Sequence, residues 1–191
     1  MERVYTYKVN ADDRIDHVSS DWLQFAQENN APHLNTEAVI GQPIFQFVSN
    51  EETRHLYEMI LDRVRTRGNE VVVPFRCDSP SVRRFMELEV SPGPHGQVQF
   101  QGRILREERR QPMPLLDSSI NRDDDFLKVC SWCKRVQAEG EWLEVELAVE
   151  RLELFNRKRL PQISHGICDD CGINLRRRIK DKKHPEQRPR G

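Results

Sequence analysis

The residues of this chain best suited to chemistry are four cysteines arranged as two close pairs. Two residues separate Cys130 from Cys133, and two residues separate Cys168 from Cys171. This spacing lets both thiolates of a pair face one point, and two such pairs supply the four soft ligands of tetrahedral zinc. The sequence therefore predicts a structural zinc site with Cys130, Cys133, Cys168 and Cys171 as metal ligands, and it predicts no catalytic residue.

Two other interpretations of these cysteines stay open. A CxxC pair can be a redox-active dithiol, although the first pair lacks a strand-then-helix context and the second pair would be left unexplained. His165 lies three residues before Cys168 and could replace one thiolate as a ligand, whereas four cysteines already complete a tetrahedral site. If all four thiolates bind, no position remains for water, so zinc-dependent hydrolysis is disfavoured.

Two cations follow the first pair directly. Lys134 and Arg135 would partly offset the charge of a tetrathiolate site, or they belong to a solvated surface. The fifth cysteine, Cys77, stands apart from the pairs and is interpreted as a small, half-buried side chain without a role.

Hydrophobic periodicity predicts the elements that must position these groups. Alternation of apolar and polar residues indicates two short strands, over 5–9 and 15–18, followed by a helix capped at 19–21. A longer helix is predicted to begin at the capping box Ser49-Asn50-Glu51-Glu52 and to end at Gly68.

Three further strands are predicted over 71–75, 86–90 and 98–104. Pro74 has no amide hydrogen, so the first of these strands is expected at a sheet edge or a bulge. Two strands, then helices, then three strands predict an α+β fold, in which helices gather on one side of a five-stranded antiparallel sheet.

The region between the two cysteine pairs predicts one helix over residues 141–157. Five apolar side chains share its face: Val145, Ala148, Val149, Leu152 and Phe155. So short a unit has little core of its own, and a metal site is expected to pin it. The predicted organisation is an α+β domain over 1–107, a linker over 108–125, a four-cysteine zinc-binding unit over 126–178, and a basic disordered tail over 179–191.

Composition limits the classes of function. The chain has 191 residues with a formal net charge of -1, so no global field draws it onto nucleic acid or an anionic membrane. The N-terminus lacks the apolar stretch of a signal peptide or membrane span, and paired thiols fit a reducing compartment. A cytoplasmic location without membrane contact is therefore expected.

The first half resembles a PAS domain over roughly residues 3–107. The resemblance rests on the order of elements, on Ile40-Gly41-Gln42-Pro43-Ile44-Phe45 before the longer helix, and on Arg103-Ile104-Leu105-Arg106-Glu107 at the end. The second half resembles a cysteine-rich segment at the end of some bacterial sensor and signalling proteins. That match consists of Cys130-Ser131-Trp132-Cys133-Lys134-Arg135, Trp142, Ile163-Ser164-His165-Gly166-Ile167-Cys168 and Cys171.

The PAS resemblance implies a pocket for a small ligand, haem or flavin, whose occupancy is relayed to a partner. The ligand of this chain is not identified by the sequence. The motif of the flavin photosensors is missing, so Cys77 is not expected to be a photoreactive thiol. His55 lies on the longer helix where haem-binding relatives carry a ligand, but Leu56 beside it occupies the apolar face.

The leading hypothesis is a non-catalytic signalling protein in which a ligand-sensing or dimerising PAS domain is coupled to a zinc unit that contacts a partner protein. No P-loop, Gly-x-Ser-x-Gly elbow or kinase-like arrangement is present in the sequence. The expected partners are a signalling protein or a second copy of the chain.

Two alternative functions belong to other classes. A nucleic-acid-binding regulator would use the zinc unit and the basic residues that follow it, although aromatic residues for base stacking are missing there. Those basic residues are Arg176, Arg177, Arg178, Lys180, Lys182 and Lys183. An enzyme, either a thiol oxidoreductase or a hydrolase, is less favoured, because the carboxylates of 123–125 have the pattern of a solvated turn.

Overall fold

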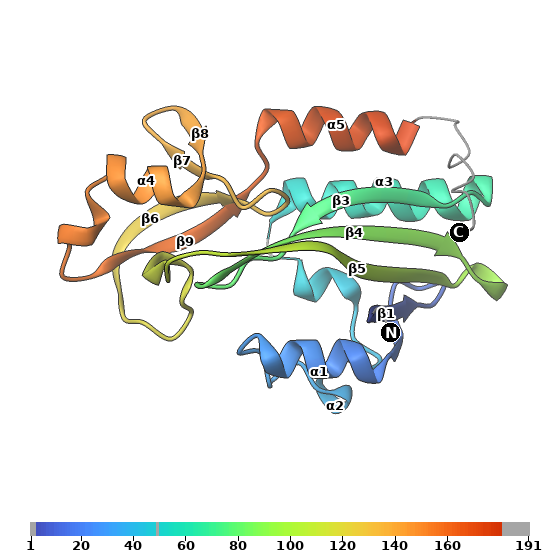
Figure 1. Ribbon diagram of the computed structural model, residues 1–191. Coiled ribbons are helices and arrows are strands. Elements are labelled where there is room, and N and C mark those ends of the chain that lie inside the picture. Colours follow the sequence, from blue (N-terminus) through green and yellow to red (C-terminus); the bar gives the residue numbers. More distant parts are fainter. Residues whose placement is uncertain (1–2, 49, 181–191) are drawn as a thin grey trace.

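A computed structural model describes residues 3–48 and 50–180 of the chain. Its first sheet has five antiparallel strands in the order β2-β1-β5-β4-β3. Figure 1 shows β4 between β3 and β5. These strands are β1 (Val4–Val9), β2 (Ile15–Val18), β3 (Val71–Arg76), β4 (Val82–Pro92) and β5 (Val98–Arg109). The predicted α+β fold class with a five-stranded antiparallel sheet is confirmed, and β3 lies at the edge, as Pro74 predicts.

One face of this sheet is apolar and the other is polar. The pairing places Phe100 of β5 opposite both Tyr7 of β1 and Val90 of β4, so the alternating apolar residues of adjacent strands lie on one face. On the opposite face, Arg103 forms ion pairs with Glu87 and Glu89. The apolar face is therefore the one that must be covered by helices.

The helices α1 (Ser20–Glu28), α2 (Thr36–Val39) and α3 (Glu51–Arg67) follow β2. Buried residues of α3 at helical spacing join the core of the sheet: Leu56, Ile60, Leu61 and Val64. Trp22 of α1 also packs against this core.

The start of α3 differs from the predicted capping box. Asn50, not a serine, is the cap residue, and its side chain accepts a hydrogen bond of 2.6 Å from the Thr53 amide. Ser49 lies outside the described residues. The Glu52 carboxylate accepts from the distant Ile167 amide at 3.0 Å. This carboxylate therefore makes a tertiary hydrogen bond, whereas the capping box predicts a local one. The helix ends at Gly68, which has a φ of 67°, as predicted.

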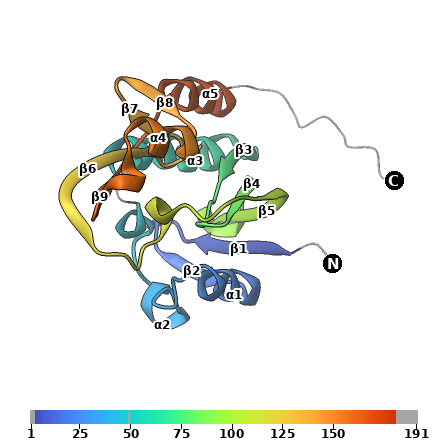
Figure 2. The same ribbon diagram turned by 60° about the vertical axis from the view of Figure 1, so that its left-hand side comes forward.

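A second sheet follows, with four strands in the order β8-β7-β6-β9. Its strands are β6 (Arg122–Cys130), β7 (Val136–Ala138), β8 (Glu141–Leu143) and β9 (Leu160–Gly166). Strands β6 and β9 are parallel, and Figure 2 shows β6 strongly curved. A separate apolar core lies here, formed by Met113, Leu115, Leu127, Val129, Val136, Ala138, Val145, Ala148, Val149 and Leu154.

The helix predicted over 141–157 is wrong in its bounds. Residues 141–143 form β8, which pairs with β7, and the helix α4 covers only Val145–Arg151. A short 3-10 turn, Leu154–Asn156, follows, and Phe155 is exposed. The first residues of the apparent helical pattern therefore form a hairpin strand. The α-helix ends at Arg151, and Phe155 then points away from the core.

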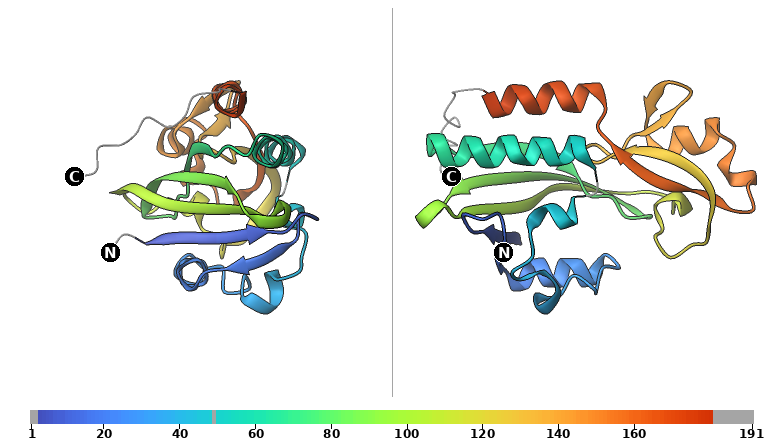
Figure 3. Two further views of the ribbon diagram at one scale, coloured as in Figure 1. Left: turned by 90° about the vertical axis from the view of Figure 1, so that its right-hand side faces the viewer. Right: turned by 180° about the vertical axis from the view of Figure 1, so that it is seen from behind.

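A second helix of this half, α5 (Asp169–Lys180), was not predicted. It packs against α3 and β3, and the two helices run alongside each other (Figure 3). Its apolar pattern is sparse, because only Gly172, Leu175 and Ile179 are buried. Leu175 and Ile179 belong to the core of the five-stranded sheet.

The segment 108–125, which the sequence predicts to be a linker, contains ordered structure. It holds the end of β5, a 3-10 turn at Pro114–Leu116 and the start of β6, and Leu115 is fully buried. The division of the chain into domains stays a prediction. Of the predicted tail, residues 179 and 180 belong to α5, and 181–191 lie outside the described residues.

No helix within 3–48 and 50–180 is long and apolar enough to cross a membrane.

Candidate metal centre and adjoining pocket

The four paired cysteines converge at the junction of β6, β9 and α5. Their sulfur atoms all lie within 4.8 Å of one another, and the Sγ atoms of Cys133 and Cys168 are 3.7 Å apart. A tetrahedral zinc ion with bonds of about 2.3 Å to sulfur needs ligand sulfurs about 3.8 Å apart. The donor set and its spacing therefore fit a four-coordinate, thiolate-bound metal ion.

The first pair lies on a tight turn at the end of β6. Cys130 is the last residue of this strand and pairs with Gly166 of β9. Its amide donates to the Arg135 carbonyl at 2.8 Å, and its carbonyl accepts from the Lys134 amide at 3.0 Å. Lys134 takes a positive φ of 62°, an uncommon conformation for a residue other than glycine. This reversal turns the Cys133 sulfur back toward Cys130.

The second pair lies at the start of α5. Cys168 directly precedes the helix, and its carbonyl accepts from the Gly172 amide at 2.9 Å. Cys171 follows in the first turn. The positive end of the helix dipole therefore faces the sulfurs, which favours their thiolate forms.

Hydrogen-bond donors surround the sulfurs. The Arg135 guanidinium donates to Cys133 Sγ at 3.3 Å and to Cys168 Sγ at 3.5 Å. The Cys168 amide donates to Cys130 Sγ at 3.4 Å. Of the two cations after the first pair, Arg135 contacts the centre, whereas the Lys134 ammonium donates to the Ser131 carbonyl at 2.9 Å.

The close packing of the cluster lowers the pKa of Cys130 and raises the pKa values of Cys168 and Cys171. Hydrogen bonds from Cys133 and Cys171 lower the pKa of Cys130. Burial raises the pKa of Cys168 to about 11, and the bonds of Cys171 to Cys130 and Cys133 raise the pKa of Cys171. A bound dication would remove this conflict, because it stabilises every thiolate at once.

His165 does not belong to the cluster of potential metal ligands. It lies on β9 opposite Val129, and its side chain is exposed. The group that the structure brings together among the described residues consists of the four cysteines alone.

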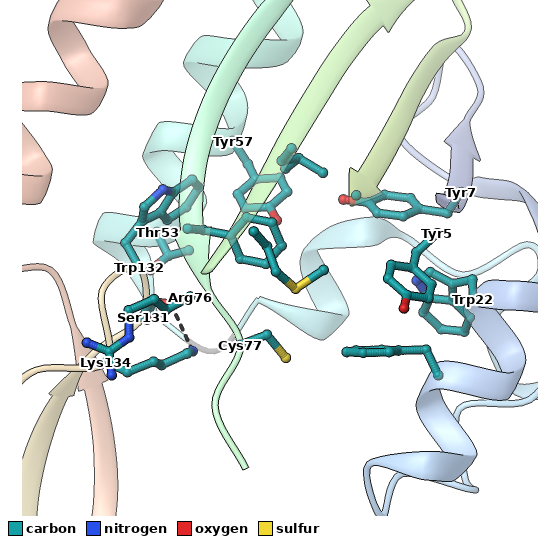
Figure 4. Close-up of a pocket in the computed structure, with 15 residues that line it drawn as sticks. Tyr5, Tyr7, Trp22, Thr53, Tyr57, Arg76, Cys77, Ser131, Trp132 and Lys134 are labelled. Carbon is teal, nitrogen blue, oxygen red and sulfur yellow. Dashed lines mark hydrogen bonds between the residues drawn. The ribbon is translucent and has the colours of Figure 1, made fainter. Parts of the chain in front are cut away.

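A pocket of about 320 Å³ adjoins the metal centre, between the apolar face of the five-stranded sheet, α1 and α3. Figure 4 shows Tyr57 and Trp132 on one side of it, and Tyr5, Tyr7 and Trp22 on the other. Phe25 and Phe75 add two more aromatic rings to the lining. The pocket is therefore suited to flat, apolar molecules.

Trp132, the residue between Ser131 and Cys133, forms part of the pocket wall. The residue is only 6% exposed, and its indole Nε1 donates to the Pro74 carbonyl at 2.7 Å. Its ring meets Tyr57 edge-on, with centroids 6.1 Å apart, and its carbonyl accepts from the Arg76 amide at 2.8 Å. This role of Trp132 is not among those predicted from the sequence. A tryptophan between two metal ligands in a unit with few apolar residues was the available signal.

Several polar groups reach into this aromatic space. Burial raises the pKa of the Tyr7 and Tyr57 phenols, so both stay protonated at neutral pH. Thr53 is 8% exposed, and its hydroxyl has no hydrogen-bond partner among the described residues. Such a buried, unsatisfied hydroxyl is unusual and marks a place where a ligand atom could bind.

Two residues considered from the sequence take different positions here. Cys77 lines the pocket, and burial raises the pKa of its thiol, which keeps it protonated and unreactive at neutral pH. The His55 side chain is 61% exposed beside Glu58, outside the pocket.

Two solved structures align with part of this chain. A domain of an HTR-like protein from Haloarcula marismortui shares 13% identity over 54% of this chain and 98% of its own, with a TM-score of 0.38. A sensory box sensor histidine kinase from Vibrio cholerae shares 12% identity over 54% of this chain and 82% of its own, with the same TM-score. No family model matches the sequence, and no curated protein matches it. These similarities are too low to place the chain in a family.

A network of charged side chains joins the two sheets beside the pocket. Arg76 of β3 is buried and donates to Asp78 and to Glu144, the residue that precedes α4. Arg110 bonds Glu146 of α4 at 3.1 Å and lies 3.3 Å from Asp78. We call this network the charge seam, and its members are Arg76, Asp78, Arg83, Arg110, Glu144 and Glu146. Sequence reasoning did not find it, because its residues are scattered along the chain.

Proposed function

We propose that the chain is a non-catalytic sensory protein of signal transduction, in which a PAS-like domain is coupled to a structural zinc site. The observation that carries this proposal is the convergence of four cysteine sulfurs beside the pocket of the five-stranded sheet. Cys130, Cys133, Cys168 and Cys171 would hold the ion. Four protein ligands complete a tetrahedral coordination, which favours a structural role over hydrolysis.

A tetrahedral set of four thiolates suits zinc or an iron-based centre, and we propose zinc. The two are distinguished by metal analysis and an absorption spectrum of the purified full chain. We expect about one zinc per chain and no visible band. Substitution by Co²⁺ should produce intense sulfur-to-metal absorption, and the Cys171→Ser variant should lose it.

The matched control for this substitution is Cys77→Ser, which removes a thiol outside the cluster and should leave zinc content unchanged. The redox alternative makes the opposite prediction. If all four paired cysteines react with a thiol reagent before any chelator is added, the structural metal site is refuted.

The sensory part of the proposal rests on the fold and the pocket. The sheet, α1 and α3 surround a space of ligand size, and reduced thiols at the adjoining centre fit a cytoplasmic location. The output would be a contact with a partner signalling protein or a second copy of the chain. A tagged full chain should capture a partner when zinc-loaded and lose it as Cys171→Ser. Capture of the same partner by both forms would contradict a role for the zinc unit.

Nucleic-acid binding is a second candidate, supported by the exposed face of α5. Arg176, Arg177, Arg178 and Lys180 are all exposed there, so their charges are available to phosphates. A gel-shift assay that persists at moderate salt would support it. Replacement of Arg176 and Arg177 by Gln should then weaken binding and reduce its salt dependence, and retention of full binding would exclude α5 as the interface.

A further inference from the structure

We infer that the first cysteine pair is a movable wall of the aromatic pocket, so that metal binding and the binding of a planar aromatic anion strengthen each other. This inference rests on the proposed function and extends it with a ligand class and a means of regulation. It follows from three features of the described residues: the place of Trp132, the contacts of the start of α3, and the polar groups of the pocket.

Trp132 connects the metal centre to the pocket through a very short segment of chain. Cys130 and Cys133 flank it in sequence, and the turn that aligns their sulfurs also orients its ring. The ring reaches the pocket by its bond to the Pro74 carbonyl and its contact with Tyr57. A metal ion that holds both sulfurs would therefore hold the indole in the wall. Without the ion, the turn would lose this constraint, and the indole would be held by its bonds to β3 and its contact with Tyr57 alone.

The start of α3 contacts both cysteine pairs. The Asn50 side-chain Nδ2 lies 3.5 Å from Oγ of Ser131, which stands within the first pair, and the Glu52 carboxylate accepts from the Ile167 backbone amide just before Cys168. Thr53 follows directly, and its unpartnered hydroxyl lies in the pocket lining. The turn of α3 that presents this hydroxyl is thus tied to the same two segments that the metal would join.

The lining selects for a flat molecule with a negative group. Seven aromatic rings, including Trp132, surround the space, and rings favour planar partners through stacked and edge-on contacts. Two cations lie in the lining, Arg76 and Lys134. Arg76 is paired with Asp78 and Glu144, whereas Lys134 bonds a neutral carbonyl among the described residues, so its charge is available to an anion. Lys134 belongs to the movable wall.

Trp132 and Lys134 line the pocket and lie on the turn that carries two of the proposed metal ligands, so the two sites are coupled, and any such coupling is reciprocal. If the metal raises the affinity for the aromatic anion by some factor, the anion raises the affinity for the metal by the same factor. Couplings of this kind are commonly about 5- to 150-fold. We expect a coupling of about tenfold or more here.

The first experiment measures this reciprocity in the wild-type full chain, with 2-naphthoate as the probe. Calorimetry gives the Kd of 2-naphthoate for the zinc-loaded and the chelator-treated protein, and far-UV circular dichroism records the fold of each. Chelator competition then gives the zinc affinity with and without saturating 2-naphthoate. We expect the same increase, about tenfold or more, in both directions. Saturable binding with zinc affinity unchanged by 2-naphthoate would overturn the linkage.

Two variants test the wall without removing a sulfur. Trp132→Leu should keep one zinc per chain and weaken 2-naphthoate binding by about tenfold or more, because the ring contacts disappear. Trp142→Leu is the matched control, since Trp142 borders the metal centre outside this pocket. Equal 2-naphthoate affinities for Trp132→Leu and Trp142→Leu would refute Trp132 as a wall residue.

Lys134→Gln should weaken the binding of 2-naphthoate but leave the binding of 2-naphthol, an uncharged analogue, unaffected. Equal losses for both probes would refute selection for an anion.

The outcomes separate this inference from the proposed function. If the purified chain binds no zinc, the proposed function fails, and the inference fails with it. If the chain binds one zinc but the zinc-loaded protein binds no 2-naphthoate, the metal site stands, whereas the proposed ligand class is wrong.

Discussion

The two sheets of this molecule bury their apolar residues by different means. The five-stranded sheet turns one whole face toward α1 and α3, and large side chains such as Phe100, Leu56 and Ile60 are fully covered there. The four-stranded sheet has shorter strands and a smaller core, in which Ala138 and Ala148 occupy buried positions. The first core can exclude water by apolar area alone, whereas the second half needs further constraints.

Those constraints lie between the two cores. Cys130, Trp132 and Cys168 belong to the same apolar cluster as the five-stranded sheet, together with Leu175 and Ile179 of α5. The metal centre is therefore built against the first core and not in an isolated appendage. The second half therefore depends on the first through two sets of contacts, the sulfur cluster and the charge seam.

Removal of one sulfur should give the largest effect. Cys130 is fully buried, and Cys130→Ser should lower zinc affinity by more than about a hundredfold, because even partners outside the coordination shell commonly contribute 10- to 100-fold. Chelator competition measures this loss. Hydrogen exchange should then accelerate in α5 and β9 more than in β1 and β5. Uniform acceleration would show that the two halves unfold as one unit, and unchanged exchange would contradict a role for the centre in holding α5.

Disruption of the charge seam should come next. The Asp78 side chain is 1% exposed between Arg76 and Arg110, so Asp78→Asn removes one carboxylate partner from each of two buried guanidinium groups, which keep only Glu144 and Glu146. We expect a loss of about 3 kcal/mol in the free energy of unfolding, measured by urea denaturation. A loss below about 1 kcal/mol would mean that the seam is solvated and does not join the halves.

A cavity in the second core tests the segment that the sequence predicts to be a linker. Leu115→Ala removes a fully buried side chain and should lower the free energy of unfolding by about 2 to 3 kcal/mol. Leu116→Ala, at the neighbouring half-buried position, is the control and should have a smaller effect. If the two variants are equally stable in urea, residues 108–125 act as a linker and the second core is smaller than described.

The smallest effect is expected on the polar face of the five-stranded sheet. Glu89 pairs with Arg103 at 2.7 Å on a partly exposed surface, and Glu89→Gln should alter the free energy of unfolding by less than about 1 kcal/mol. The same urea titrations, repeated at high salt, should reduce even this difference, because salt screens exposed charges. An effect as large as that of Asp78→Asn would contradict the assignment of this face to solvent.

Much of the first half could be predicted from the sequence, because its signals are local. Alternation of Tyr5, Tyr7 and Val9 indicated a strand, and Pro74 indicated an edge, since each pattern reflects which neighbours a residue can have in a sheet. The second half was harder to predict. Residues 141–157 carry a helical pattern, but pairing between β7 and β8 overrides it, and α5 shows too few apolar residues to be recognised.

The sequence by itself determined that four thiols come in two pairs, each able to face one point, because that property depends only on the spacing within each pair. Only the tertiary structure decided that the two pairs meet and that Trp132 enters the pocket. It also decided that Arg135, and not Lys134, contacts the sulfurs. The physical reason is that these contacts join segments separated along the chain. The parallel pairing of β6 with β9 and the packing of α5 on α3 bring those segments together.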